Sequence, residues 1–231
     1  MPTSITSTGI TFPDATTQTT AAAGGGDYAM EAFTSPGTWT KPANVTAVKV
    51  TVVGGGGGGG GARAVNTGAK VSYSGGGAGG SVEYLDAPAV PGPVAITVGA
   101  GGNGGPAPGS PGVATSGNSG GTSSFGTFCS ATGGGGGLNN STVNSGLGGA
   151  GSGGTINYNG QNGYSQESGG ASVLGQGGRI KWATSPSPTP GSATPGEVYG
   201  GGASGVVSPI TNLPRAGGSG ASGIVIVEYW S

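Results

Sequence analysis

Short runs of alternating apolar and polar residues recur along most of the chain and predict β-strands. In the clearest run, residues 45–53, Val48, Val50 and Val52 share one face and polar residues occupy the other. This period of two is that of an extended strand, whose successive side chains point to opposite sides. Similar runs occupy residues 30–34, 38–40, 81–85, 94–98 and 224–229. No segment has a helical period, so the pattern predicts an all-β fold.

The longest runs are expected to belong together in a β-sandwich-like domain. We predict that residues 45–53, 81–85, 94–98 and 224–229 form one sheet system. Trp39 and Trp230 lie in predicted strands and are expected in its core. Cys129 ends an apolar stretch and is interpreted as a small buried hydrophobic residue.

Glycine tracts separate the predicted strands, and one region of them has a period of three. Between residues 146 and 178, glycine fills eight of the eleven positions counted in threes from Gly148, although only 13 of these 33 residues are glycine. The same spacing recurs at residues 217–223. Three residues per turn is the period of the polyproline II helix, which has no internal hydrogen bonds. We therefore predict closely packed polyglycine II helices in both regions, joined by long surface loops.

Composition supports an ordered chain that does not bind nucleic acid. Glycine supplies 59 of the 231 residues, and charged residues are only 6% of the chain. Disorder combines high net charge with few apolar residues, whereas here the net charge is −1 and apolar runs recur throughout. The basic residues do not cluster along the sequence, which argues against a nucleic-acid or polybasic membrane partner. No apolar run is long enough for a membrane helix, and we expect no secretory signal.

The chain is expected to divide into a short arm and one domain. Residues 1–26 are rich in Thr and Ser and too short to bury a core, so they are interpreted as an N-terminal attachment or oligomerisation arm. Residues 27–231 form the predicted glycine-rich β-domain. Ordering a glycine costs roughly 0.5–1 kcal/mol more than ordering an alanine. A dense hydrogen-bond lattice or contacts between subunits must offset this cost, so a rigid bundle, an oligomer or both are expected.

Few residues are available for catalysis. The chain has no histidine and one cysteine, which removes histidine-assisted nucleophiles and zinc sites. Glu83 and Asp86 are close in sequence, but Glu83 belongs to an alternating strand and is interpreted as a solvated residue. Three prolines follow the glycine-rich stretch at 101–105 and prevent the helix that a nucleotide-binding loop requires. We expect no enzyme activity, no cofactor and no metal.

Binding has better support, from insertions that interrupt the glycine tracts. These are residues 62–74, 103–118, 138–147, 155–167, 179–198 and 206–215. The predicted receptor contacts are the aromatic residues within these insertions or directly beside them: Tyr73, Tyr158, Tyr164, Trp182 and Tyr199. Aromatic rings with Ser, Asn and Gly between them give rigid area and adaptable polar groups, and Trp182, near Arg179 and Lys181, is the strongest candidate. The alternative is that these rings anchor the loops to the bundle.

Several motifs, in order along the chain, resemble a known family. Phe33-Thr-Ser-Pro-Gly-Thr-Trp-Thr-Lys-Pro42 followed by Val48-Lys-Val-Thr-Val-Val-Gly-Gly resembles the start of the glycine-rich domain common in phage tail-fibre proteins. Ile96-Thr-Val-Gly-Ala-Gly-Gly, Gly121-Thr-Ser-Ser-Phe-Gly, Ala131-Thr-Gly-Gly-Gly-Gly and Gly223-Ile-Val-Ile-Val-Glu-Tyr229 continue the resemblance. Gly9-Ile-Thr-Phe-Pro-Asp-Ala-Thr-Thr-Gln-Thr-Thr20 looks like a segment of phage fibre and tail-appendage proteins. The glycine tracts with intervening loops are also similar to the polyglycine II distal adhesins of T-even phages.

This resemblance implies a virion protein of a bacteriophage tail or fibre, assembled in the host cytoplasm. Its loops would attach the virion to a host surface polysaccharide or outer-membrane protein. The arm would join other tail or fibre proteins and other copies of the chain, with no nucleic acid and no membrane insertion. A homotrimer is expected because such fibres are usually threefold. A second interpretation is an inert structural spacer or cap of the tail or fibre. A third is an ice-binding polyglycine II protein, and an enzyme such as a capsule depolymerase ranks last.

Overall fold

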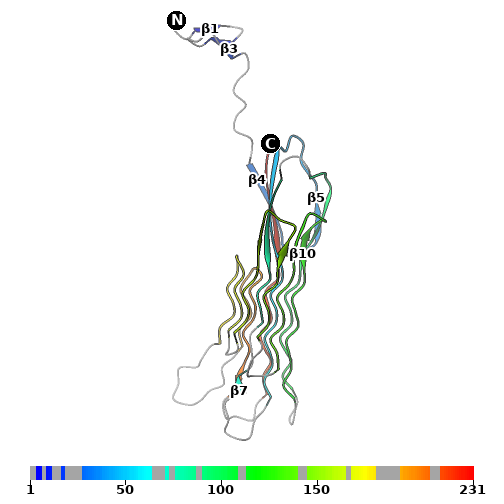
Figure 1. Cartoon of the computed structure of the whole chain (residues 1–231), viewed down its shortest axis with the longest axis vertical. Coiled ribbons are helices and arrows are strands. Elements are labelled where there is room, and N and C mark those ends of the chain that lie inside the picture. Colours follow the sequence, from blue (N-terminus) through cyan, green and yellow to red (C-terminus); the bar gives the residue numbers. More distant parts are fainter. Residues whose placement is uncertain are drawn as a thin grey trace.

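The computed structural model describes residues 4–6, 9–11, 17–18, 28–63, 71–72, 76–86, 90–108, 113–139, 145–164, 168–180, 193–208 and 214–231. These residues form strands and extended segments, with no helix among them (Figure 1). The strands are β1 (Ser4–Thr6), β2 (Gly9–Thr11), β3 (Thr17–Gln18), β4 (Tyr28–Phe33), β5 (Gly37–Trp39), β6 (Ala47–Val53), β7 (Val71–Ser72), β8 (Ser81–Asp86), β9 (Val94–Thr97), β10 (Ser123–Phe125), β11 (Cys129–Ala131), β12 (Gly151–Ser152), β13 (Ile156–Tyr158), β14 (Val207–Ser208) and β15 (Ile224–Trp230).

Two five-stranded antiparallel sheets pack face to face as a β-sandwich. The first sheet has the order β13-β8-β6-β15-β4, and the second has the order β12-β11-β10-β9-β5. One core of buried residues lies between them: Trp39, Val45, Val48, Val50, Val52, Val90, Val94, Ile96, Phe125, Cys129, Ala131, Val225 and Val227. The all-β class predicted from the alternating runs is confirmed, and so is the sandwich-like arrangement.

Alternation in β6 sets which side chains enter this core. Val48, Val50 and Val52 are at most 1% exposed, whereas the residues between them are only half-buried. Burying a Val, Leu or Ile side chain contributes about 1.5–3 kcal/mol relative to leaving it exposed. The strand therefore lies with this face inward, and a shift in register by one residue would expose all three valines.

Two details of the predicted sandwich are wrong. Residues 94–98 were expected in the same sheet as 45–53, but β9 pairs with β5 and β10 in the opposite sheet. The alternating pattern would bury Val94 and Ile96 in the core whichever of the two sheets contained the strand. The pattern therefore does not determine the sheet. Trp230 was expected in the core, but it is half-buried and packs against Tyr28 in a tilted arrangement, with ring centroids 5.5 Å apart.

Two small sheets complete the strand inventory of the described residues. In the predicted arm, β1, β2 and β3 form an antiparallel sheet in that order. The division between arm and domain at residue 26 stays a prediction. At the end of the molecule away from the sandwich, β7 pairs with β14 in a two-stranded antiparallel sheet (Figure 1).

Between the sandwich and β7 run glycine-rich extended segments, which we call the glycine bundle (Figure 1). Its segments are residues 54–61, 76–80, 99–105, 115–121, 133–138, 145–150, 160–164, 168–172, 175–179, 194–197, 200–206 and 215–223. Successive segments run in opposite directions, and each hydrogen bonds to its neighbours rather than to itself.

Segment 54–61 has a hydrogen-bond pattern that repeats every three residues. It donates to three neighbours in rotation: residues 54 and 57 bond to segment 76–80, residues 55, 58 and 61 to segment 115–121, and residues 56 and 59 to segment 215–223. It accepts bonds from three others: segments 99–105, 133–138 and 200–206. A polyglycine II helix has three residues per turn, so its N–H groups point in three directions and its carbonyl groups in three others. Segment 54–61 is such a helix, and its six neighbours surround it in a hexagonal lattice.

Full enclosure explains why the central segments have almost no side chains. Residues 54–62, 76–80 and 200–206 are buried without exception. A Cβ atom at Gly57 would lie 2.1 Å from the carbonyl oxygen of Gly135, and one at Gly59 would lie 1.9 Å from that of Ser204. Glycine is required at these positions by the close approach of neighbouring backbones.

The predicted polyglycine II packing with a period of three is confirmed, but the residues that adopt it differ from those predicted. Residues 146–178 are not one continuous helix, because β12 and β13 interrupt them and the chain reverses repeatedly. Peripheral segments there keep glycine mainly where they face inward, as at Gly175 and Gly178, which are buried. Segment 215–223 contains the second predicted region and bonds to segment 54–61.

Cys129 is buried in the sandwich core, as predicted. Desolvation by burial raises the pKa of its thiol to about 11, outweighing a backbone hydrogen bond at Phe125 that lowers it. The thiol is therefore protonated and inaccessible near neutral pH. We expect the folded protein to react negligibly with a disulfide reagent at about pH 8, and the urea-unfolded protein to react with one thiol per chain. Rapid reaction of the folded protein would contradict this burial.

Candidate functional site

The end of the glycine bundle away from the sandwich is called the loop end, and the described chain enters and leaves the connections of the bundle there. Segments that leave the sandwich, such as 54–61 after β6, run toward this end, and segments such as 76–80 before β8 return. The described residues that flank the connections at 64–75, 106–114, 139–144, 165–167, 180–193 and 207–214 therefore lie toward the loop end. Described residues about 150 positions apart in sequence meet at this end, because Ala62 and Arg215 form an antiparallel bridge.

One edge of the bundle is hollowed into an open groove of about 750 Å³, which we call the edge groove. Segment 168–172 forms its floor, and segments 160–164 and 175–179 form its two walls. Backbone bonds hold the walls to the floor: Gln161 N donates to Ala171 O at 3.1 Å, and Gly169 N donates to Gly178 O at 2.9 Å.

The side chains of the edge groove lie at two levels. On each wall they are three residues apart, Gln161 with Tyr164 and Gln176 with Arg179, so each pair shares one face of a threefold helix. The bonds to the floor place Gln161 level with Gln176, and Tyr164 level with Ser168 and Arg179. At about 3.1 Å per residue, the two levels are separated by about 9 Å.

The edge groove offers polar and aromatic groups to solvent. The side chain of Tyr164 is 59% exposed, and Gln161, Gln176 and Arg179 are also exposed. Arg179 is held by its carbonyl oxygen, which accepts a hydrogen bond of 2.6 Å from Thr194 Oγ1. A second groove, lined by Gln176, Arg179 and Glu197 among others, lies on the far side of segment 175–179. Gln176 and Arg179 thus border both grooves.

The five predicted receptor contacts do not come together. Tyr164 lines the edge groove, but Tyr158 is in β13, where it pairs with Ser81 of the first sheet. Tyr199 is half-buried in the turn that precedes segment 200–206, and its carbonyl oxygen accepts a hydrogen bond from Ser172 Oγ. Tyr73 and Trp182 lie outside the described residues, so their predicted role is untouched.

Sequence reasoning missed the residues that accompany Tyr164. Gln161, Ser168 and Gln176 were not singled out, and Arg179 was noted only as a neighbour of Trp182. The signal was present in the three-residue period predicted for 146–178. Applied to side chains rather than to glycines, that period places Gln161 with Tyr164, and Gln176 with Arg179.

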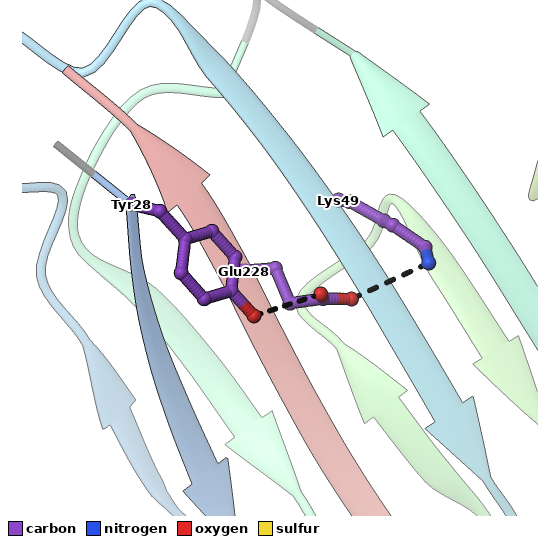
Figure 2. Close-up of polar contacts among 3 residues, drawn as sticks. All are labelled: Tyr28, Lys49 and Glu228. Atoms are coloured by element: carbon purple, nitrogen blue, oxygen red, sulfur yellow. Dashed lines mark hydrogen bonds and ion pairs between the residues drawn. The ribbon is translucent and has the colours of Figure 1, made fainter. Parts of the chain in front are cut away.

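Two carboxylates of the sandwich, those of Glu228 and Glu31, make contacts between strands. Tyr28 Oη donates to Glu228 Oε1 at 3.0 Å, and Lys49 Nζ lies 3.4 Å from Glu228 Oε2 (Figure 2). This cluster links β4, β15 and β6, and the hydrogen bond to Glu228 is the main cause of the raised pKa of Tyr28. Tyr229 Oη donates to Glu31 Oε1 at 3.1 Å. The pKa of Tyr229 is raised, mainly by desolvation and in second place by this hydrogen bond.

Within the described part of the chain, no group of three or more His, Cys, Asp or Glu residues is placed to hold a metal ion. No helix in that part is long and apolar enough to cross a membrane. Glu83 and Asp86 lie on β8, where Glu83 pairs with Thr51 and Asp86 with Val48. The expected lack of enzyme activity stays a prediction.

Comparison with known families identifies the domain. The family model described as a glycine-rich domain matches residues 31–230, so the chain belongs to the glycine-rich domain family. The match spans the sandwich from β4 to β15 together with the whole glycine bundle. A search of curated proteins finds no match.

Proposed function

We propose that this chain is a host-attachment protein of a bacteriophage tail fibre, assembled in the host cytoplasm and carried on the virion. The observation that supports this proposal is the shared position, at the loop end, of the described residues that flank the bundle's connections. A lattice of backbone hydrogen bonds fixes the base of each connection, so different loops can be presented together on a rigid support.

The rest of the proposal assigns roles to the arm and to the loop end. The N-terminal arm joins other tail or fibre proteins and other copies of the chain in a homotrimer. The loop end then points away from the virion toward a polysaccharide or outer-membrane protein of the host. The exposed Tyr164 and the amide side chains in the same groove favour this role over an inert spacer. A spacer has no ligand and does not require an open polar groove.

The proposal predicts that Tyr164 of the edge groove and Trp182 of the insertion at 179–198 are needed for adhesion. Replacing Tyr164 or Trp182 by alanine should weaken saturable binding of labelled protein to susceptible bacteria. An aromatic hot spot contributes on the order of 2 kcal/mol, so the loss should be about thirtyfold. Flow cytometry over a range of protein concentrations measures this loss.

Tyr158→Ala is the matched control, because Tyr158 is an exposed tyrosine in β13 of the sandwich. It should bind cells as the parent does. Immunogold labelling of particles that contain the protein should place it on a tail appendage. Normal cell binding by folded Tyr164→Ala and Trp182→Ala variants would instead support an inert spacer, and label confined to the capsid would contradict both interpretations.

A further inference from the structure

The glycine bundle and the sandwich carry opposite net charge, although the charges are spread evenly along the sequence. Residues 54–80, 99–122, 132–150 and 159–223, which form the bundle and its connections, contain five basic and two acidic residues. The remaining residues, which form the sandwich and the N-terminal arm, contain two basic and six acidic residues, four of them after residue 27. A chain of net charge −1 therefore divides into a part of net charge +3 and a part of net charge −4. The bundle attracts anions that the sandwich repels.

Arg179 is the basic residue of this part that borders both grooves. Among the described residues, an ion pair joins Lys49 to Glu228 in the sandwich. Arg179 forms no ion pair with a described carboxylate. Glu197 lies across segment 175–179 in the second groove. The guanidinium therefore keeps its planar set of donors available for a carboxylate or phosphate, which it can bind through two parallel hydrogen bonds.

The other groups of the edge groove suit a sugar. Tyr164 is level with Arg179, and its exposed ring offers an apolar face with a polar tip. Gln161 and Gln176 stand about 9 Å away along the groove, and each amide carries both donors and acceptors for hydroxyl groups. One level thus combines a cation with an aromatic ring, and the other offers only neutral polar groups.

We propose that the edge groove binds an acidic sugar unit of a surface polysaccharide. Arg179 binds its carboxylate or phosphate, the ring of Tyr164 packs against its sugar ring, and Gln161 and Gln176 bind hydroxyl groups of the adjoining unit. This inference rests on the proposed function and names the chemical class of its ligand.

Isothermal titration calorimetry of the full chain with two matched probes tests the inference. The first probe is a tetramer of galacturonic acid, and the second is its methyl ester, which keeps the sugar backbone and removes the charge. The parent should bind the acid at least about tenfold more tightly than the ester, as expected for hydrogen bonds to a charged group. Arg179→Gln should reduce acid binding to the level of the ester, and Tyr164→Ala should weaken both.

Lys41→Gln, which removes a cation from the sandwich, is the control and should bind both probes as the parent does. Circular dichroism should show that every variant is folded, since Arg179 and Tyr164 are exposed. Equal affinity for acid and ester, or binding of neither, overturns the inference. So does unchanged acid binding by Arg179→Gln, or equally tight Arg179-dependent binding of a single-stranded oligonucleotide of the same charge. Cell adhesion that survives Arg179→Gln leaves the proposed function standing while this inference fails.

Discussion

Replacing Gly57 by alanine is expected to lower the free energy of unfolding by about 4 kcal/mol or more, into the exceptional range for a single substitution. Gly57 N donates to Gly77 O at 2.9 Å, and Gly77 N donates to Gly135 O at 2.9 Å. The new Cβ would lie 2.1 Å from that same Gly135 oxygen. Only a separation of neighbouring backbones relieves this overlap, and it breaks the hydrogen bonds that define the lattice.

Other glycines provide graded controls for this experiment. A Cβ at Gly135 would lie 3.1 Å from the nearest atom, Leu147 N, and one at Gly37 would lie 3.4 Å from the Phe33 ring. The loss of stability should therefore fall in the order Gly57→Ala, Gly135→Ala, Gly37→Ala. For a domain of this size, 4 kcal/mol corresponds to a fall of roughly 10 °C in the thermal midpoint. Equal midpoints for the Gly57 and Gly37 variants would contradict the hexagonal lattice.

Trp39→Ala is expected to destabilise the sandwich by about 3–5 kcal/mol, the range for removing a large aromatic side chain from a core. Trp39 is fully buried in β5, and its ring centroid lies 5.7 Å from that of Phe125 and 6.0 Å from that of Tyr229. It thereby joins the second sheet to the first. Urea unfolding followed by linear extrapolation measures the loss.

Trp39→Phe should cost much less, about 2 kcal/mol or below. The indole Nε1 of Trp39 is buried without a hydrogen-bond partner in the described structure, and such an unsatisfied donor costs about 1–3 kcal/mol. Phenylalanine removes this donor while keeping most of the aromatic volume. If Trp39→Phe is as damaging as Trp39→Ala, the N–H group is satisfied in solution and the assigned cost is wrong.

Strands could be predicted from the sequence better than their arrangement. Alternation at Val48, Val50 and Val52 identifies both the strand β6 and its inward face, because burial acts on each side chain separately. The choice of sheet for β9 depends instead on pairing with β5, a contact between strands more than 50 residues apart. Period alone carries no information about such partners.

The three-residue period is visible only at the edge of the bundle. A peripheral helix needs glycine where it faces inward, so glycine recurs every third residue, as at Gly175 and Gly178. A fully surrounded helix needs it on all three sides, and the eight consecutive glycines of segment 54–61 then have no period at all. The most deeply buried part of the lattice was therefore the hardest to recognise.

The predicted receptor contacts were scattered by chain reversal. Successive segments run in opposite directions, so the residues between them emerge alternately at the loop end and beside the sandwich. The insertion at 155–167 includes both Tyr158 in β13 and Tyr164 in the edge groove. Composition marks such a stretch as an insertion, but only the direction of the flanking segments tells which end a residue occupies.

The position of β15 constrains when the domain can fold. This last strand of the domain lies between β4 and β6, and the preceding segment 215–223 completes the surroundings of segment 54–61. While the chain is still emerging from the ribosome, the strand between β4 and β6 is therefore missing. It becomes available only when the final residues of the domain are released. Pairings across such sequence distances are intrinsically slow. Folding is therefore expected to follow synthesis as a late, cooperative event, and a truncation that removes β15 takes out the strand that joins β4 to the rest of a sheet whose other strands were made first.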